Sequence, residues 1–329
     1  MPTRRRALLI LAALAGLSLL SIAAALAVGS VAIGPVEVLS TLFGGAGGTA
    51  GDVVRSLRLP RALTGFACGG LLALAGALLQ VLLRNPLADP YVLGISGGAG
   101  IGALLAIVLG LGVVGINGLA FAGALGAMLL VFGLAHGDGG WTQSRLLLTG
   151  VIVAAGCGAV VTLLLAIAPE DRLRGMLFWL MGDLSQTAAP QLVLILLALL
   201  LLVALPFARE LNLLARGADL AQALGVAVRP VRGGVYVVAS LATAAAVTHA
   251  GAIGFIGLIV PHLVRLATGN DQRLLLPASV LGGGSLLVIA DTLARTVLAP
   301  QQLPVGVLTA LIGVPVFLFL LSRAAPGRR

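Results

Sequence analysis

The residues of this chain that could do chemistry are few, and their spacing matches no common catalytic pattern. Only 9% of the 329 residues are charged, and there are three histidines and two cysteines. The sequence contains neither the metalloprotease pattern H-E-x-x-H nor the hydrolase pattern G-x-S-x-G. Cys68 and Cys157 lie in separate apolar runs, which favours packing roles over a metal or redox site. We therefore expect no catalytic residue, no metal site and no cofactor.

The basic residues are unusual because all 20 of them are arginine. A Walker A loop needs a lysine to reach the nucleotide phosphates, so this chain cannot form that kind of ATP site. A process driven by ATP would then need a separate ATPase subunit. The net charge of +9 is no sign of a nucleic-acid partner, because the arginines stand at the ends of apolar runs and form no basic domain.

The composition indicates where the polypeptide resides. Hydrophobic residues make up 60% of the chain. Charged residues make up only 9%, whereas soluble domains usually carry about 25%. Helices can expose such apolar surface to lipid because they satisfy their own backbone hydrogen bonds. The sequence predicts an all-α, polytopic membrane protein with one transmembrane domain over 1–329. The run 7–28 follows three arginines and is long enough to span a bilayer, so we expect an uncleaved first helix.

Apolar runs bounded by charges or turn residues predict about ten transmembrane helices. They are 7–28, 61–82, 93–113, 117–135, 146–168, 190–207, 231–250, 252–268, 276–297 and 304–322. With the N-terminus in the cytoplasm, 14 arginines fall on the cytoplasmic side and 6 on the outer side, as the positive-inside rule requires. Both termini are then cytoplasmic. The least certain division is at Gly251, which separates the seventh and eighth runs.

Three connections are longer than tight turns. The segment 29–60 is expected to form an outer loop, and 169–189 to contain a short interfacial helix over 174–184, with Trp179 as its anchor. The segment 208–230 is the longest cytoplasmic loop, and a short helix is expected over 218–224, closed by a glycine. Glycines at spacing four predict close helix packing, in the pairs Gly65/Gly69, Gly94/Gly98 and Gly98/Gly102.

Several short motifs interrupt the apolar runs, and together they are specific. They are RLPR (58–61), NPLADP (85–90), GISGGAG (94–100), SRLLLTG (144–150), GFIGLIVPH (254–262) and LPVG (303–306). With these motifs the chain resembles the permease subunits of ATP-binding-cassette importers for iron-siderophores, haem and cobalamin. The resemblance extends from about residue 30 to the C-terminus.

The resemblance implies an architecture and a set of partners. The permease would have ten helices and work with a second copy of itself, in the inner membrane of a bacterium. The pathway would follow the dimer axis, lined by the fifth and tenth spans. Two cytoplasmic ATP-binding subunits would bind on one side, and a periplasmic substrate-binding protein would deliver the cargo on the other.

The resemblance also assigns roles to residues of the 208–230 loop. Its short helix matches the coupling helix that inserts into the ATPase in similar permeases. The residues expected to couple to the ATPase are Arg216, Gly217, Asp219, Gln222, Leu224 and Gly225. The alternative is an ordinary solvated loop, but Leu220 and Leu224 would then be exposed to the cytosol with no partner.

Two further sites follow from the resemblance. Arg58, Arg61 and Arg295 on the outer side would bind acidic residues of the binding protein. The alternative is local pairing, since Asp291 lies one helical turn before Arg295. Thr142 and Gln143, between the fourth and fifth spans, would form a cytoplasmic gate; the alternative is a plain polar turn.

The cargo is less well determined than the class. Residues 290–300 (ADTLARTVLAP), followed by LPVG, look most like haem permeases, so haem is favoured over ferric siderophores, with cobalamin third. His249, near the outer end of the seventh run, is a minor candidate for transient contact with cargo. An ion-coupled secondary transporter is disfavoured, because Asp291 is the one carboxylate clearly within a predicted span.

Overall fold

The computed structural model describes residues 4–29, 33–42, 48–135, 142–185 and 190–323, and in these ranges the chain is helical with no strand. Seven helices of this part are long and apolar enough to cross a membrane, and three shorter helices are also apolar. The prediction of an all-α membrane protein is thereby confirmed.

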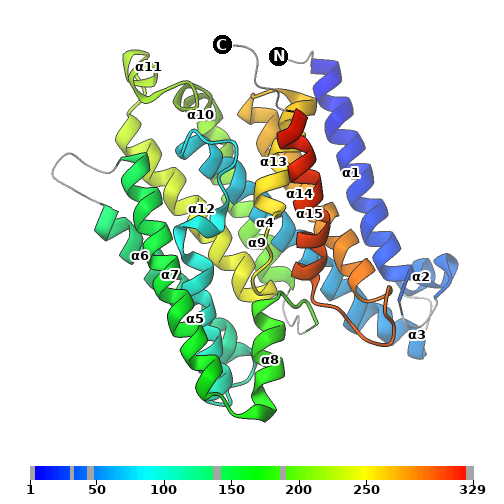
Figure 1. Cartoon of the computed structure of the whole chain (residues 1–329). Coiled ribbons are helices and arrows are strands. Elements are labelled where there is room, and N and C mark those ends of the chain that lie inside the picture. Colours follow the sequence, from blue (N-terminus) through cyan, green and yellow to red (C-terminus); the bar gives the residue numbers. More distant parts are fainter. Residues whose placement is uncertain (1–3, 30–32, 43–47, 136–141, 186–189, 324–329) are drawn as a thin grey trace.

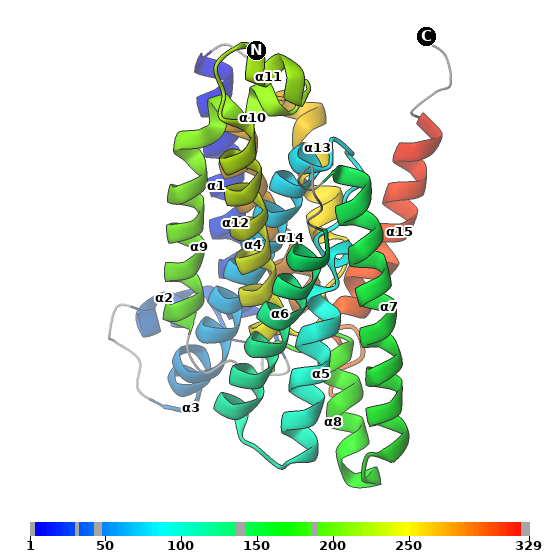
Figure 2. The ribbon, with the colours of Figure 1, turned by 90° about the vertical axis from the view of Figure 1, so that its left-hand side faces the viewer.

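Each of the ten predicted runs coincides with one apolar helix. These helices are α1 (Arg4–Ala27), α4 (Leu59–Leu82), α5 (Ile95–Val108), α6 (Val113–Ala135), α7 (Gln143–Ile167), α9 (Pro190–Ala204), α12 (Val228–Ala250), α13 (Ile256–Thr268), α14 (Gln272–Ala294) and α15 (Val305–Arg323). α1 begins and α15 ends at the same end of the bundle as α11, which we call the α11 end (Figures 1 and 2). The opposite end, which carries α8 and the α5–α6 connection, is called the α8 end.

Short helices connect the long ones. They are α2 (Pro35–Leu42), α3 (Thr49–Asp52), the π-helix η1 (Val53–Arg58), the 3-10 helices η2 (Pro90–Leu93) and η3 (Leu205–Phe207), α8 (Glu170–Leu180), α10 (Ala208–Leu214) and α11 (Ala218–Ala223). The segment 29–60, which the sequence predicts as a long outer loop, contains helices that were not predicted, because α2, α3 and η1 lie in it and η1 continues directly into α4. A small apolar cluster formed by Leu26, Ile33, Val38 and Val54 holds these pieces against the end of α1.

The short helix between α7 and α9 begins earlier than the sequence predicts. α8 starts at Glu170, directly after Pro169, and Glu170 and Asp171 occupy its first turn, where carboxylates suit the helix dipole. Trp179 is half-buried against the main core, and its role as an interfacial anchor stays a prediction. α8 is thus part of the packed structure at the α8 end.

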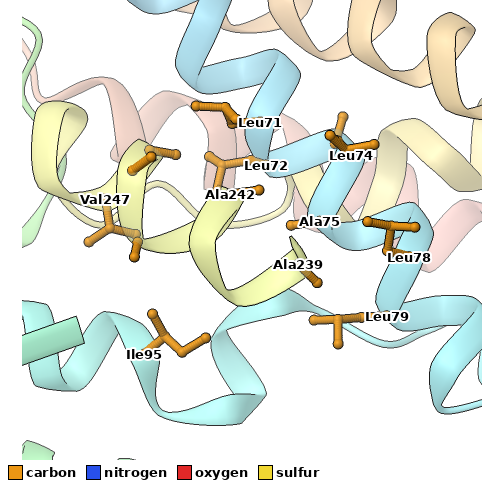
Figure 3. Packing of buried hydrophobic residues seen from close by; sticks show 14 of the residues in the cluster. Leu71, Leu72, Leu74, Ala75, Leu78, Leu79, Ile95, Ala239, Ala242 and Val247 are labelled. Carbon is orange, nitrogen blue, oxygen red and sulfur yellow. The ribbon is translucent and has the colours of Figure 1, made fainter. Parts of the chain in front are cut away.

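α4 is the central helix of the bundle. It packs against α14, α12, α13 and α9, and nearly all of its residues from Ala62 to Leu82 are buried. Figure 3 shows leucines of α4 next to Ala239, Ala242 and Val247 of α12, with Ile95 of α5 close by. Such packing between small and branched side chains holds helices together in a membrane.

The close helix packing expected at glycines spaced four apart is confirmed at three positions. A Cβ on Gly69 would overlap the carbonyl of Gly283 in α14, and one on Gly98 or Gly102 would overlap backbone carbonyls of α6. Gly94 has another role, because its φ of 74° lies in the left-handed region and turns the chain into α5. Gly65 makes ordinary van der Waals contacts.

A side chain of α4 compensates for the proline inside α13. Pro261 has no N–H, so the carbonyl of Gly257 loses its usual partner in the helix. The side-chain nitrogen of Gln80 lies 3.4 Å from the Gly257 oxygen and 3.2 Å from the Leu258 oxygen, and donates to them. Arg265 in turn donates to the Gln80 oxygen over 2.8 Å. This network joins α4 to α13 within the core.

Candidate functional site

At the α11 end, two glycines delimit the short helix α11. Gly217 precedes it with a φ of 135°, and Gly225 follows it with a φ of 84°, both in the region that favours glycine. The N–H of Gly225 donates to the Gln222 carbonyl and the N–H of Val226 to the Ala221 carbonyl, which is a Schellman ending. The predicted helix and its closing glycine are confirmed.

α11 presents apolar side chains outward. Leu220 and Leu224 are 45% and 59% exposed, whereas Ala221 is fully buried beneath them. Asp219 lies in the first turn, where its charge suits the helix dipole. The structure therefore brings the predicted ATPase-coupling residues to one corner of the molecule, with two leucines available to a partner.

The predicted gate residues lie beside this corner and tie α7 to α4. The hydroxyl of Thr142 accepts a hydrogen bond from the Arg145 N–H and so caps α7. The Gln143 side chain donates to the Leu82 carbonyl over 2.8 Å and accepts from Arg84 over 3.2 Å. Gln143 thus belongs to a contact between two helix ends, and the segment is more than a plain polar turn.

At the α8 end, two of the predicted arginines share one buried carboxylate. Arg61 donates to both carboxylate oxygens of Asp291 through the Nη2 and Nε of one guanidinium edge, at 2.8 and 2.9 Å, and its Nη1 donates to Gln302 over 2.9 Å. Arg295 pairs with Asp291 at 3.5 Å, as its spacing of four predicts. The side chains of Arg61, Arg295 and Asp291 are 13%, 10% and 4% exposed.

Arg295 and Arg58 also bind the end of α1. Arg295 donates to the Ala25 carbonyl over 2.8 Å, and Arg58 to the Leu26 carbonyl over 2.7 Å. The last carbonyls of a helix lack partners in the helix itself, so the two guanidinium groups cap it. These contacts are the local pairing that the sequence left open as an alternative. Contact with a binding protein stays a prediction.

The LPVG motif, the end of α8 and the end of α12 meet at a tight junction. The Val305 N–H donates to the Gly182 carbonyl over 3.0 Å, and the Asp183 N–H to the Ala250 carbonyl over 2.9 Å. A Cβ on Gly306 would overlap the Met181 carbonyl. The LPVG glycine is therefore required by the close approach of two backbones.

The end of the NPLADP motif and the following Tyr91 connect to the link between α12 and α13. Asp89 accepts from the Tyr91 N–H, and burial raises the pKa of its carboxyl while that hydrogen bond opposes the shift. The Tyr91 hydroxyl donates to the Ile253 carbonyl and accepts from the Ile253 N–H, both over 2.8 Å. Tyr91 thereby satisfies both the carbonyl and the N–H of Ile253, which lies in the non-helical link between α12 and α13.

The histidine weighed as a cargo contact is bound locally. His249 Nδ1 lies 2.9 Å from the Ala245 carbonyl, one turn earlier in α12. No group of three or more histidine, cysteine, aspartate or glutamate side chains that could hold a metal is found in the described ranges.

The structure is a bundle of apolar helices long enough to cross a membrane, and comparison with known proteins identifies its class. One solved structure, an inward-facing conformation described as a metal-chelate type ABC transporter, superposes with a TM-score of 0.84 at 31% identity, covering 96% of this chain and 99% of that chain. Residues 5–323 match the FecCD transport family. The chain belongs to this family, and it is a permease of an ABC importer.

Two relatives with stated cargo are about equally similar. The cobalamin import permease of Halobacterium salinarum is 43% identical over 280 residues, which cover 83% of this chain and 74% of the relative. The hemin transport permease of Yersinia pestis is 41% identical over 282 residues, covering 83% and 84%. The family resemblance read from the motifs is confirmed, while overall identity does not separate the two cargoes.

Proposed function

We propose that this permease translocates haem, as one half of a homodimeric importer in a bacterial inner membrane. The observation that carries this choice is the segment 290–300 followed by LPVG, whose pattern is most like haem permeases. The 41% identity to a hemin permease agrees with it. Cobalamin is the second candidate because of the 43% relative, and a ferric siderophore the third.

The homodimer is supported by exposed apolar surface on α7 and α15. The two helices lie on the same side of the bundle in both views (Figures 1 and 2). Large side chains exposed on them are Leu148, Ile152, Leu163, Leu311, Leu318 and Phe319. A second copy placed against this side would enclose a pathway between the two protomers.

The orientation follows from the arginines. We place the α11 end in the cytoplasm, with all ten apolar helices crossing the bilayer and both termini inside. Two ATPase subunits would then bind the 208–230 loop through Leu220 and Leu224. Thr142 and Gln143 would act as the cytoplasmic gate, because the contact of Gln143 with α4 must change if α7 moves.

The periplasmic binding protein would bind at the α8 end. The side chains of Arg61 and Arg295 keep 13% and 10% of their surface exposed there, which an acidic side chain of the binding protein could reach at the edge of the Asp291 cluster. Arg295→Glu should weaken binding-protein association at low salt, and Arg295→Gln should do so less. Unchanged association for both, with intact stability, would refute this contact.

Transport by the reconstituted complex tests the cargo directly. The permease, its ATPase and its binding protein are placed in proteoliposomes, and uptake of haem, cobalamin and a ferric siderophore is compared with and without ATP. We expect ATP-dependent uptake of haem to exceed that of the other two. ATP-driven uptake of cobalamin alone would overturn the haem assignment and leave the permease function intact.

A further inference from the structure

A basic cavity opens at the α11 end. It has a volume of about 830 Å³ and lies among α1, the end of α4, α10 and the connection between α13 and α14. Four arginines from four separate segments line it, namely Arg6, Arg84, Arg216 and Arg265. No local sequence pattern marks this cluster, since the four positions are far apart in the chain.

In the part of the chain that the structure describes, four guanidinium groups and a single carboxylate line the cavity. The carboxylate that lines it, Asp271, caps α14 by accepting from the Arg273 N–H, and it also accepts from the Asn212 side chain. Arg84 and Arg265 donate to glutamine side chains, which carry no charge. A cavity with several arginines and one occupied carboxylate favours an anion.

The position of the cavity suits a lipid headgroup. Gln80 and Val81 belong to the last turn of α4, and Leu266 to the last turns of α13, so the cavity lies where apolar helices end. Leu8 and Leu9 of α1, next to Arg6, are about 60% exposed, and so is Leu266. Apolar surface beside a basic cavity matches an acyl chain below a phosphate, and basic pockets at cytoplasmic helix ends bind anionic headgroups.

We propose that this cavity binds the phosphate of an anionic phospholipid from the cytoplasmic leaflet. The guanidinium groups would donate to the phosphate oxygens, and the acyl chains would lie along α1. The bound lipid would fix the start of α1 against α10 and α13, beside the corner where the ATPase is expected. The proposal rests on the membrane orientation given above and is independent of the cargo.

Native mass spectrometry of the full chain in detergent tests the site with defined lipids. Phosphatidylglycerol and phosphatidylcholine are titrated onto the wild type, onto the double variant Arg6→Gln/Arg265→Gln, and onto the control Arg5→Gln/Arg273→Gln. The control loses the same charge at exposed neighbours that do not line the cavity. We expect the first double variant to bind phosphatidylglycerol about ten-fold more weakly, and the control to stay within about two-fold.

A second experiment distinguishes a lipid phosphate from free inorganic phosphate. Thermal unfolding is followed with phosphatidylglycerol or with inorganic phosphate, and we expect only the lipid to raise the midpoint of the wild type. Equal protection by inorganic phosphate would overturn the lipid assignment. Equal loss of lipid binding in both double variants would show general charge attraction and overturn the site. Displacement of the lipid by the ATPase subunit would overturn it as well. If the double variant folds poorly, Arg6→Gln alone is used, since Arg6 is an exposed residue of the first turn of α1.

Discussion

The two ends of the bundle differ in how far the residues predicted to bind a partner are buried. At the α8 end, Arg61, Arg295 and Asp291 are nearly buried and bind one another. At the α11 end, Leu220 and Leu224 stand exposed on a six-residue helix that two glycines isolate. The difference shows that the charged side chains at the α8 end find most of their partners within the subunit, whereas Leu220 and Leu224 at the α11 end leave much of their apolar surface uncovered by it.

Removing the shared carboxylate should have the largest effect of the changes considered. Asp291→Asn keeps the shape of the side chain but leaves Arg61 and Arg295 without their counter-charge in a nearly buried site. We expect the free energy of unfolding, measured with denaturant in detergent micelles, to fall by about 3–5 kcal/mol.

A matched carboxylate shows whether the burial of Asp291 is responsible. Asp171 lies 4.0 Å from Arg172, and its side chain is 79% exposed. We expect Asp171→Asn to change the stability by at most about 0.5 kcal/mol. Similar losses for both variants would contradict the description of the α8 end as an internally satisfied cluster.

The α11 end should respond in binding and leave stability unchanged. Burying two leucines in a partner contributes about 1.5–3 kcal/mol each, so Leu220→Ser/Leu224→Ser should weaken ATPase association by about ten-fold or more. A pull-down titration with the purified ATPase measures this. Leu109→Ser/Val114→Ser, which alters two exposed apolar residues at the opposite end, is the control and should not change association. Loss of stability without loss of association would reverse the comparison between the ends.

The smallest expected effect concerns the contact between α7 and α4. Gln143→Leu removes the hydrogen bonds to Leu82 and Arg84, which should lower the free energy of unfolding by about 1 kcal/mol. Gln191→Leu, at an exposed position in the first turn of α9, should leave it nearly unchanged. If Gln143 is part of a gate, its variant should also change the basal ATPase rate of the complex, which a purely structural contact would not do.

Most of the fold could be predicted because its signal is local. The length of each apolar run is enough to predict a helix there. Gly225 likewise predicts the end of α11 to within a few residues. The helices in the segment 29–60 were not predicted, because α2 and η1 depend on contacts of Val38 and Val54 with the end of α1. Such short helices gain their stability from packing that no local pattern records.

For the candidate sites too, contacts between residues close in the chain could be predicted and contacts between distant residues could not. The pairing of Asp291 with Arg295 could be predicted, since the residues are four apart on a helix. The pairing of Asp291 with Arg61 could not, because 230 positions separate them in the chain. Arg58 gave no sign in the sequence that it would be buried against the carbonyls of α1. The roles of the coupling, docking and gate residues stay predictions.

The bond from Gln80 to α13 has a consequence for motion. If α13 tilted away from α4, the carbonyl of Gly257, which has no helical donor because of Pro261, would lose the Gln80 side chain inside the membrane, where an unsatisfied group costs several kcal/mol. α4 and α13 are therefore expected to move as one rigid body when the transporter changes state. We expect the hinge in the short non-helical link at 251–255, where Gly251 and Phe255 have positive φ angles of 68° and 71°.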